Sequence, residues 1–129
     1  MEVSVQYSKL RISTDASSKL RTLRQRIGIT PNLLCRYALL LSLEDGPIGN
    51  TPVPDDDGQE FNAYTLTGEL TQLLLATISY VEDPSGAKRL TEERVLELLR
   101  SHIHRGVGAL AVRLKSAADL FRIDNTAAA

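Results

Sequence analysis

The fold class can be read from residues 3–32, which run VSVQYSKLRISTDASSKLRTLRQRIGITPN. Apolar and polar side chains alternate from Val3 to Ser13, and this period of two predicts a strand with one apolar face. A helix is predicted to follow, because Ser13 or Thr14 can cap its N-terminus and the apolar side chains of residues 16–27 recur on one stripe.

A second helix start follows at once. Gly28 fits the left-handed residue that ends a helix, Thr30 takes the N-cap position, and Pro31 takes the first helical position, where a missing N–H costs nothing. The helix that begins there is apolar almost all round to about Leu43. We therefore expect it to be central, or to be buried by a second subunit.

Strand, helix, glycine-containing turn and helix form the order of a ribbon–helix–helix unit. In such a unit two chains pair their strands, and the ribbon can lie in the major groove of DNA. No hairpin partner directly follows residue 13, and an unpaired strand leaves its backbone groups unsatisfied. Pairing between two chains is therefore the expectation. The alternative is a strand-swapped oligomer core that binds no nucleic acid.

The remainder of the chain is predicted to be helical. Residues 44–65 form an acidic, turn-rich stretch typical of a long loop. Helices are expected over about residues 67–81 and from about Thr91 onward. Gly106 and Gly108 are candidates for a break or kink, after which a fifth apolar stripe continues at helical spacing. The predicted fold class is mainly α with a short N-terminal strand, a ribbon–helix–helix-like start followed by a helical bundle.

Length and composition fit one cytoplasmic domain. The chain has 129 residues, and domains commonly run to about 100–150. The longest nearly uninterrupted apolar run, residues 33–43, is shorter than the roughly 20 residues that a membrane span needs. No signal-peptide pattern is visible, and a single cysteine cannot form an internal disulfide. We expect one domain over residues 1–129, with a frayed tail over about 124–129.

The formal net charge of −1 conceals three blocks of opposite sign. Residues 1–43 carry a net charge of +5, residues 44–93 carry −9 and residues 94–129 carry +3. Basic side chains clustered on one segment are typical of proteins that contact phosphates. The candidate DNA-binding residues are the basic side chains of the first block, Lys9, Arg11, Lys19, Arg21, Arg24, Arg26 and Arg36.

Motifs for catalysis or metal binding are weak. Residues 55–58 read DDDG, but Val53 stands where a calcium loop needs its first Asp. His102 and His104 would point nearly opposite ways on a helix, so a shared metal is not expected. Cys35 is expected to be a buried small hydrophobe. The sequence predicts no catalytic residue, no cofactor and no metal.

Four blocks of the sequence resemble the DndE family of small DNA sulfur modification proteins. They are residues 20–36 (LRTLRQRIGITPNLLCR), 40–44 (LLSLE), 60–69 (EFNAYTLTGE) and 102–107 (HIHRGV). The resemblance implies a non-catalytic role in bacterial DNA phosphorothioation, in which sulfur replaces a non-bridging phosphate oxygen. It also implies binding to double-stranded DNA, nicked duplex included. The family's binding role is ascribed to lysines, whereas arginines predominate in the basic block of this chain.

The resemblance further implies which partners the chain has. A homo-oligomer, such as a tetramer, is expected. The expected protein partners are the ATPase and sulfurtransferase components of the same machinery, which, with a cysteine desulfurase, carry its chemistry.

Three functions remain open at this point. The first is a non-catalytic DNA-binding component. The second is a protein-interaction adaptor whose acidic loop, from Glu44 to Glu60, contacts a basic partner or shields the basic block. The third is a persulfide carrier that uses Cys35.

Overall fold

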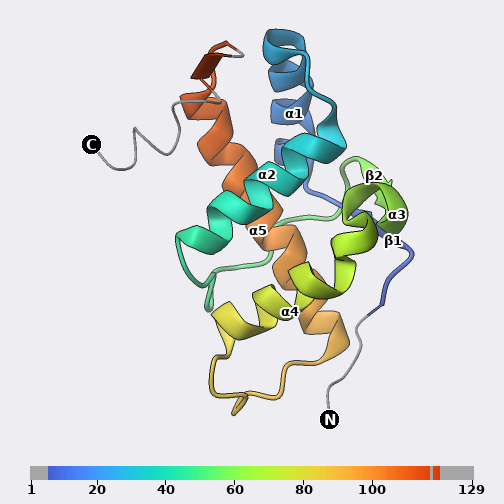
Figure 1. Ribbon diagram of the computed structural model, residues 1–129, viewed down its shortest axis with the longest axis vertical. Coiled ribbons are helices and arrows are strands. Elements are labelled where there is room, and N and C mark those ends of the chain that lie inside the picture. Colours follow the sequence, from blue (N-terminus) through green and yellow to red (C-terminus); the bar gives the residue numbers. More distant parts are fainter. Residues whose placement is uncertain (1–5, 117, 120–129) are drawn as a thin grey trace.

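The computed structural model describes residues 6–116, 118 and 119, and these form a mainly helical fold with one small sheet (Figure 1). The predicted fold class is confirmed, whereas the expected tail from residue 124 lies outside the described residues. The elements in chain order are β1 (Lys9–Arg11), α1 (Thr14–Ile27), α2 (Pro31–Glu44), β2 (Glu60–Asn62), α3 (Ala63–Leu66), the 3-10 turn η1 (Gly68–Leu70), α4 (Thr71–Glu82) and α5 (Glu92–Arg113).

The two predicted helix starts are confirmed. Ser13 is the N-cap of α1, and its Oγ accepts a hydrogen bond from the backbone N–H of Ala16 at 3.0 Å. Gly28 ends α1 with a φ of 75°, a left-handed conformation that glycine adopts without steric cost. Thr30 precedes Pro31 at the start of α2 in the extended N-cap conformation. Local sequence signals therefore set both ends of α1 and the start of α2.

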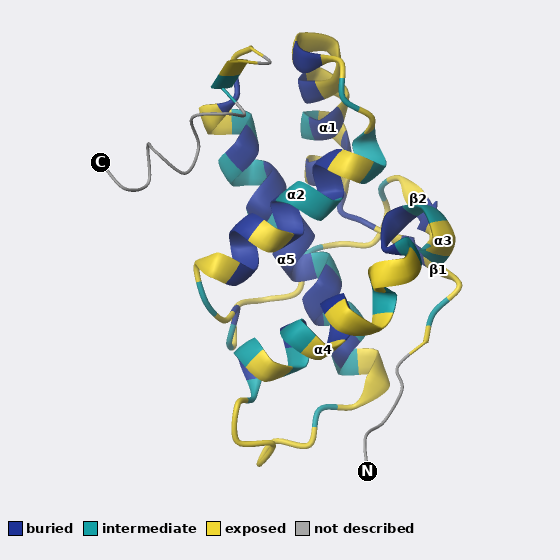
Figure 2. Ribbon diagram, viewed as in Figure 1, coloured by how far each residue is buried: buried dark blue, intermediate teal, exposed yellow. Residues whose placement is uncertain are grey.

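Helix α5 is the centre of the fold, and α1, α2 and α4 all pack against it (Figure 1). Its middle is buried in Figure 2, where it crosses α2. The apolar core includes fully buried side chains from each of these helices, among them Leu20, Leu39, Ile78, Leu99 and Ile103. Helix α2 is therefore central, as predicted, but Leu33 and Leu40 on its outer side remain exposed in the single chain.

The predicted break at Gly106 and Gly108 is wrong, because α5 runs continuously from Glu92 to Arg113. Gly106 lies where α5 crosses α2. A Cβ built on Gly106 would lie 2.8 Å from the Cα of Ala38 and would collide with the carbonyl group of that residue. The glycine therefore serves close backbone packing between two helices, and its helix-weakening tendency is overridden by tertiary contacts.

The strand partner also differs from the expectation. Strand β1 pairs antiparallel with β2 of the same chain, so the ribbon forms within one molecule. Leu10 lies opposite Phe61, and both side chains are buried. Residues 60–62 alternate exposed, buried and exposed, a pattern too short to stand out inside a stretch that otherwise reads as a loop. The strand-forming partner is therefore about fifty residues away in sequence, beyond the reach of hairpin signals.

None of the helices in the described residues is long and apolar enough to cross a membrane.

Candidate nucleic-acid interface

The two basic residues of the ribbon share one acidic partner. Lys9 Nζ lies 3.6 Å from Glu60 Oε2, and Arg11 Nε lies 3.5 Å from Glu60 Oε1. Arg11 also donates a hydrogen bond to the carbonyl of Gly58 at 3.1 Å. All three charged side chains are substantially exposed, and exposed ion pairs contribute at most about 1 kcal/mol. Lys9 and Arg11 can therefore exchange this carboxylate for another anion.

The basic side chains of α1 divide between two flanks of the helix. Lys19 and Arg26 lie on one flank, toward α5: Lys19 Nζ pairs with Asp15 at 2.7 Å, and Arg26 donates to the carbonyl of Leu114 at 3.3 Å. Arg21 and Arg24 lie on the other flank and are exposed. Within the described residues neither of them makes a side-chain hydrogen bond or ion pair. Their guanidinium groups are thus available to an external anion.

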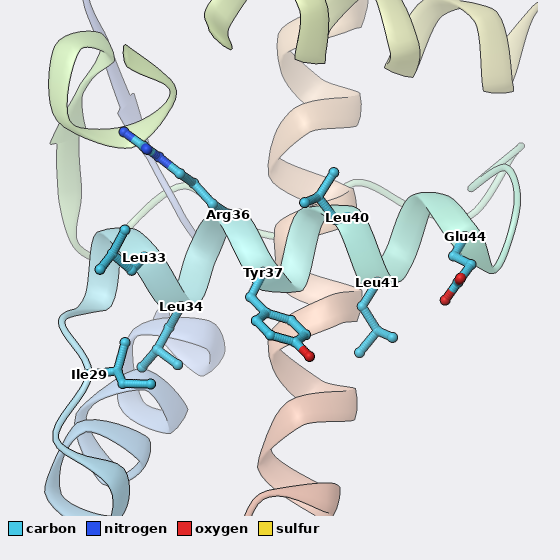
Figure 3. Close-up of a pocket in the computed structure, with 8 residues that line it drawn as sticks. All are labelled: Ile29, Leu33, Leu34, Arg36, Tyr37, Leu40, Leu41 and Glu44. Atoms are coloured by element: carbon cyan, nitrogen blue, oxygen red, sulfur yellow. The ribbon is translucent and has the colours of Figure 1, made fainter. Parts of the chain in front are cut away.

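Arg36 has a role inside the fold. It projects from α2 away from Tyr37 and Leu41 (Figure 3). Its Nε donates to the carbonyl of Leu66 at 2.7 Å, and its NH2 group donates to the carbonyl of Thr65 at 3.0 Å. These carbonyls lie at the C-terminal end of the short helix α3, where no further helical N–H is available to them. Arg36 therefore joins α2 to α3.

The acidic segment of residues 55–59 lies against the N-terminal end of α1, beside Arg21. Asp55 accepts hydrogen bonds from the backbone N–H of Thr14 at 3.0 Å and from that of Asp57 at 3.2 Å. The hydrogen bond from Thr14 is the main reason that the pKa of Asp55 lies below its ordinary value. Asp57 and Gly58 line a cleft together with Arg21. The negative segment is therefore folded onto the N-terminus of α1.

Gly58 fixes the position of that segment. Its N–H donates to the carbonyl of Ile12 at 2.8 Å, and a Cβ at Gly58 would lie 2.6 Å from that same carbonyl oxygen. The next residue, Gln59, donates its N–H to Ser17 Oγ at 2.7 Å. The acidic segment is thus held by backbone contacts that leave no room for a side chain at residue 58.

The comparison with known families bears on this arrangement. The family described as "DNA sulphur modification protein DndE" matches residues 9–118. The chain belongs to the DndE family. No curated protein matches the chain.

Two solved DndE structures share the fold. One is DndE from Escherichia coli B7A, described as involved in DNA phosphorothioation modification. It has a TM-score of 0.68 and 22% sequence identity, and the match covers 81% of this chain and 98% of that one. The other is a DndE mutant with glycine-to-lysine substitutions, described as involved in DNA phosphorothioation. It has a TM-score of 0.62 and 23% identity, covering 81% and 97% of the two chains.

This DndE chain also contains a buried polar network that the sequence did not indicate. Ser42 Oγ bonds His102 Nδ1 at 2.8 Å, and His102 Nε2 bonds Glu82 Oε2 at 2.8 Å. Glu82 accepts further hydrogen bonds from the N–H groups of Ile48 at 2.7 Å and Gly49 at 3.1 Å. Ser42, Glu82 and His102 lie on three helices and are at least twenty positions apart in the sequence, so no local spacing links them. The network anchors the segment after α2 to α4 and α5.

The protonation states in this network are consistent with one another. Burial lowers the pKa of His102, and its bond to Glu82 opposes this without reversing it. Burial disfavours ionisation of Glu82, but its bonds from Ile48, Gly49 and His102 outweigh burial, so its pKa is lowered. A neutral His102 donates from Nε2 to the carboxylate and accepts at Nδ1 from the Ser42 hydroxyl. Ser42, His102 and Glu82 thus form a row of hydrogen-bonded side chains that is buried from solvent.

Neither Cys35 nor the two histidines form an exposed reactive site. Cys35 is completely buried, and burial raises the pKa of its thiol to about 12. His104 bonds Ser13 Oγ through Nδ1 at 2.7 Å, whereas His102 belongs to the buried network. No cluster of three or more metal-ligating side chains occurs among residues 6–116, 118 and 119.

Proposed function

We propose that this protein is a non-catalytic DNA-binding component of the DNA phosphorothioation machinery. It contacts the backbone phosphates of double-stranded DNA, nicked duplex included, through Arg21 and Arg24. The observation that carries the proposal is that both arginines are exposed on one flank of α1 and have no side-chain partner among residues 6–116, 118 and 119. Membership of a DNA sulphur modification family supports it. Guanidinium groups bind phosphate oxygens through two parallel hydrogen bonds.

The ribbon extends this phosphate-binding surface. Lys9 and Arg11 exchange Glu60 for phosphate, and Arg11 and Arg21 both lie beside Gly58, which joins the ribbon to the α1 flank. Lys19, Arg26 and Arg36 act mainly within the fold, where each already has a partner. Of the seven basic residues in the first 43 positions, four therefore contact DNA and three act mainly within the fold.

A non-catalytic role is supported by the state of the nucleophiles. A thiol with a pKa of about 12 is almost entirely protonated at neutral pH, and Cys35 is out of contact with solvent. The Ser42 hydroxyl donates a hydrogen bond to His102 inside a buried network and is itself buried from solvent. The sulfur chemistry is therefore assigned to the ATPase and sulfurtransferase partners of the machinery.

Assembly with these partners, and with further copies of the chain, uses apolar side chains left exposed on α2 and α4. Leu33 and Leu40 border a groove of about 550 Å³ along α2 (Figure 3), and Leu73 and Tyr80 are exposed on α4. Exposed large apolar side chains that border a groove, as Leu33 and Leu40 do, are typical of interaction surfaces.

The double variant Arg21→Ala/Arg24→Ala tests the DNA-binding proposal. We expect duplex affinity to fall roughly tenfold or more at low salt, and the slope of log K against log salt to decrease by about two, because each phosphate contact releases about one counterion. Fluorescence anisotropy with intact and nicked duplexes at several salt concentrations measures both quantities.

The matched control removes the same charge far from α1. Lys88→Gln/Arg89→Asn changes two cations in the turn between α4 and α5, at the opposite end of the molecule (Figure 1). Asparagine suits the φ of 52° at Arg89. We expect the control to bind duplex almost as the unmodified protein does. An unchanged affinity and slope for the α1 variant would remove this flank from the interface.

A second candidate function is an adaptor that scaffolds the complex through its acidic segment and apolar helices. Asp56 and Asp57 favour it, because both are exposed and neither carboxylate bonds another group among the described residues. The same carboxylates could instead shield Arg21, since Asp57 lines a cleft with it. The two roles predict different effects of these carboxylates on the affinity for DNA.

The variant Asp57→Asn separates these roles and leaves Asp55 in place at the α1 N-terminus. A shielding carboxylate predicts duplex binding about two- to fivefold tighter at low salt, in line with the modest energy of an exposed charge pair. An adaptor role predicts unchanged DNA affinity and weaker capture of a phosphorothioation partner. Anisotropy and a pull-down on the same preparation measure both.

A further inference from the structure

The groove along α2 is apolar, and no other part of the described chain covers it. Six of its eight lining residues are aliphatic or aromatic, and two of these, Leu33 and Leu40, are 50% and 56% exposed. Neither charged residue fills the groove. The Arg36 guanidinium is bonded to two carbonyls of α3, and Glu44 lies at the far end of α2 (Figure 3). The groove therefore suits an apolar occupant.

The C-terminal end of α5 lies close to this groove. In Figure 3, Ile29, Tyr37 and Leu41 point to the side of α2 on which α1 and the C-terminal half of α5 lie. Arg26, in the last turn of α1, donates a hydrogen bond to the carbonyl of Leu114 at 3.3 Å. Ile29, which lines one end of the groove, follows Arg26 by only three residues. The ends of α1 and α5 therefore meet beside that end of the groove.

The chain turns after α5 and does not continue along the axis of the helix. Leu114, the C-cap of α5, is buried and has an extended backbone, with a φ of −94° and a ψ of 106°. The N–H groups of Lys115 and Ser116 then donate to the Asp119 carboxylate at 2.8 Å and 3.1 Å. This closed turn keeps residue 119 near the ends of α1 and α5, so the chain continues from a point beside the groove.

The four residues that follow are rich in large apolar side chains. Residues 120–123 read LFRI, so three of the four side chains are large and apolar. The match to the DndE family ends at residue 118, which leaves this segment outside the part that the family shares. Four extended residues span up to about 13 Å, and the 14 residues of α2 span about 21 Å. The segment is therefore long enough to fill much of the groove.

We propose that residues 120–123 dock in the α2 groove of their own chain, with the Phe121 ring as the main anchor. A segment tethered beside its site has an effective concentration of the order of millimolar, which favours it over a separate molecule. While docked, the segment covers apolar side chains of the proposed assembly surface, so a second copy or a partner must displace it. This regulatory consequence rests on the proposed function, whereas the docking does not.

Tryptophan fluorescence tests the docking, because the chain contains no tryptophan of its own. In Phe121→Trp we expect emission at shorter wavelength than in Ala127→Trp, and acrylamide quenching roughly threefold weaker, since a docked group loses about 70–90% of its accessible surface. Both signals should be independent of protein concentration. Adding Leu40→Gln to Phe121→Trp should bring the quenching close to that of Ala127→Trp. Adding Leu73→Gln should not, because that exposed leucine lies on α4 and does not line the groove.

Equal quenching in Phe121→Trp and Ala127→Trp, or equal effects of the two glutamine substitutions, would overturn the docking. A blue shift that develops only as the protein concentration rises would place the segment in the groove of a second copy, and would overturn docking within one chain.

Sedimentation velocity tests the regulatory consequence separately. We expect Phe121→Asp to shift the chain toward larger assemblies, whereas Ala127→Asp, with the same added charge, should sediment as the unmodified protein does. Unchanged sedimentation of Phe121→Asp would overturn the regulatory role, even where the fluorescence shows a docked segment. Neither measurement includes DNA, so both outcomes are independent of phosphate binding by Arg21 and Arg24.

Discussion

Replacing Gly106 by alanine should destabilise this protein by about 3 kcal/mol or more, or prevent it from folding, because overpacking against backbone cannot be relieved by a side-chain rotation. The new Cβ would lie 2.8 Å from the Cα of Ala38 and closer still to its carbonyl group. Helices α2 and α5 would have to separate along their contact. Urea unfolding followed by circular dichroism measures the loss.

Gly108→Ala is the control in the same helix. Its Cβ would meet no atom closer than 4.0 Å, and alanine favours a helix over glycine by about 0.5–1 kcal/mol. We expect Gly108→Ala to raise the free energy of unfolding slightly, although it is the same substitution two residues away. Equal losses in both variants would show that general helix disturbance, and not the crossing with Ala38, explains the effect at Gly106.

Removing the carboxylate of Glu82 should lower the free energy of unfolding by a similar amount. In Glu82→Ala the N–H groups of Ile48 and Gly49 and the Nε2–H of His102 lose their acceptor in a buried site. Breaking a buried charged network in this way costs about 3–5 kcal/mol. Glu97→Ala, which removes a partly exposed carboxylate paired with Arg94, should cost under about 1 kcal/mol. Similar losses in the two variants would contradict the assigned role of Glu82.

The same network makes stability depend on pH. The pKa of His102 is lowered, so the unfolded chain takes up this proton first, and stability falls as the pH drops below the ordinary value of 6.5. The pKa of Glu82 is also lowered, so its contribution is present above 4.5 and is lost as the pH falls through the folded-state pKa. Unfolding between pH 7 and pH 3 should show both losses, and Glu82→Ala should lack the lower one.

Local signals were sufficient for the N-terminal helices. The cap at Ser13, the left-handed Gly28 and the Thr30–Pro31 start each involve neighbouring residues, so the sequence contained the relevant information. The errors concern contacts between distant residues. The sequence predicts a helix break at Gly106 because it does not show the contact with Ala38 on another helix. It predicts no strand at Glu60–Asn62 because the partner strand, β1, is about fifty residues away.

The candidate interface shows the same division. The sequence predicts a basic block over residues 1–43. It does not distinguish Arg21 and Arg24, which have no side-chain partner among the described residues, from Arg36, which donates hydrogen bonds to two carbonyls at the end of α3. That distinction depends on which carbonyls the fold brings near each guanidinium. The Ser42–His102–Glu82 chain was missed for the same reason, since only the packing of three helices brings its members together.

The ribbon has a consequence for synthesis on the ribosome. Strand β1 emerges first, but its hydrogen-bonding partner at residues 60–62 is translated about fifty residues later. During that interval the nascent strand presents an unpaired edge, which is a template for aggregation. Leu10 is its apolar residue, and Lys9 and Arg11 stand on either side of it. The same two cations that pair with Glu60 in the finished fold thus act as gatekeepers while the chain is incomplete.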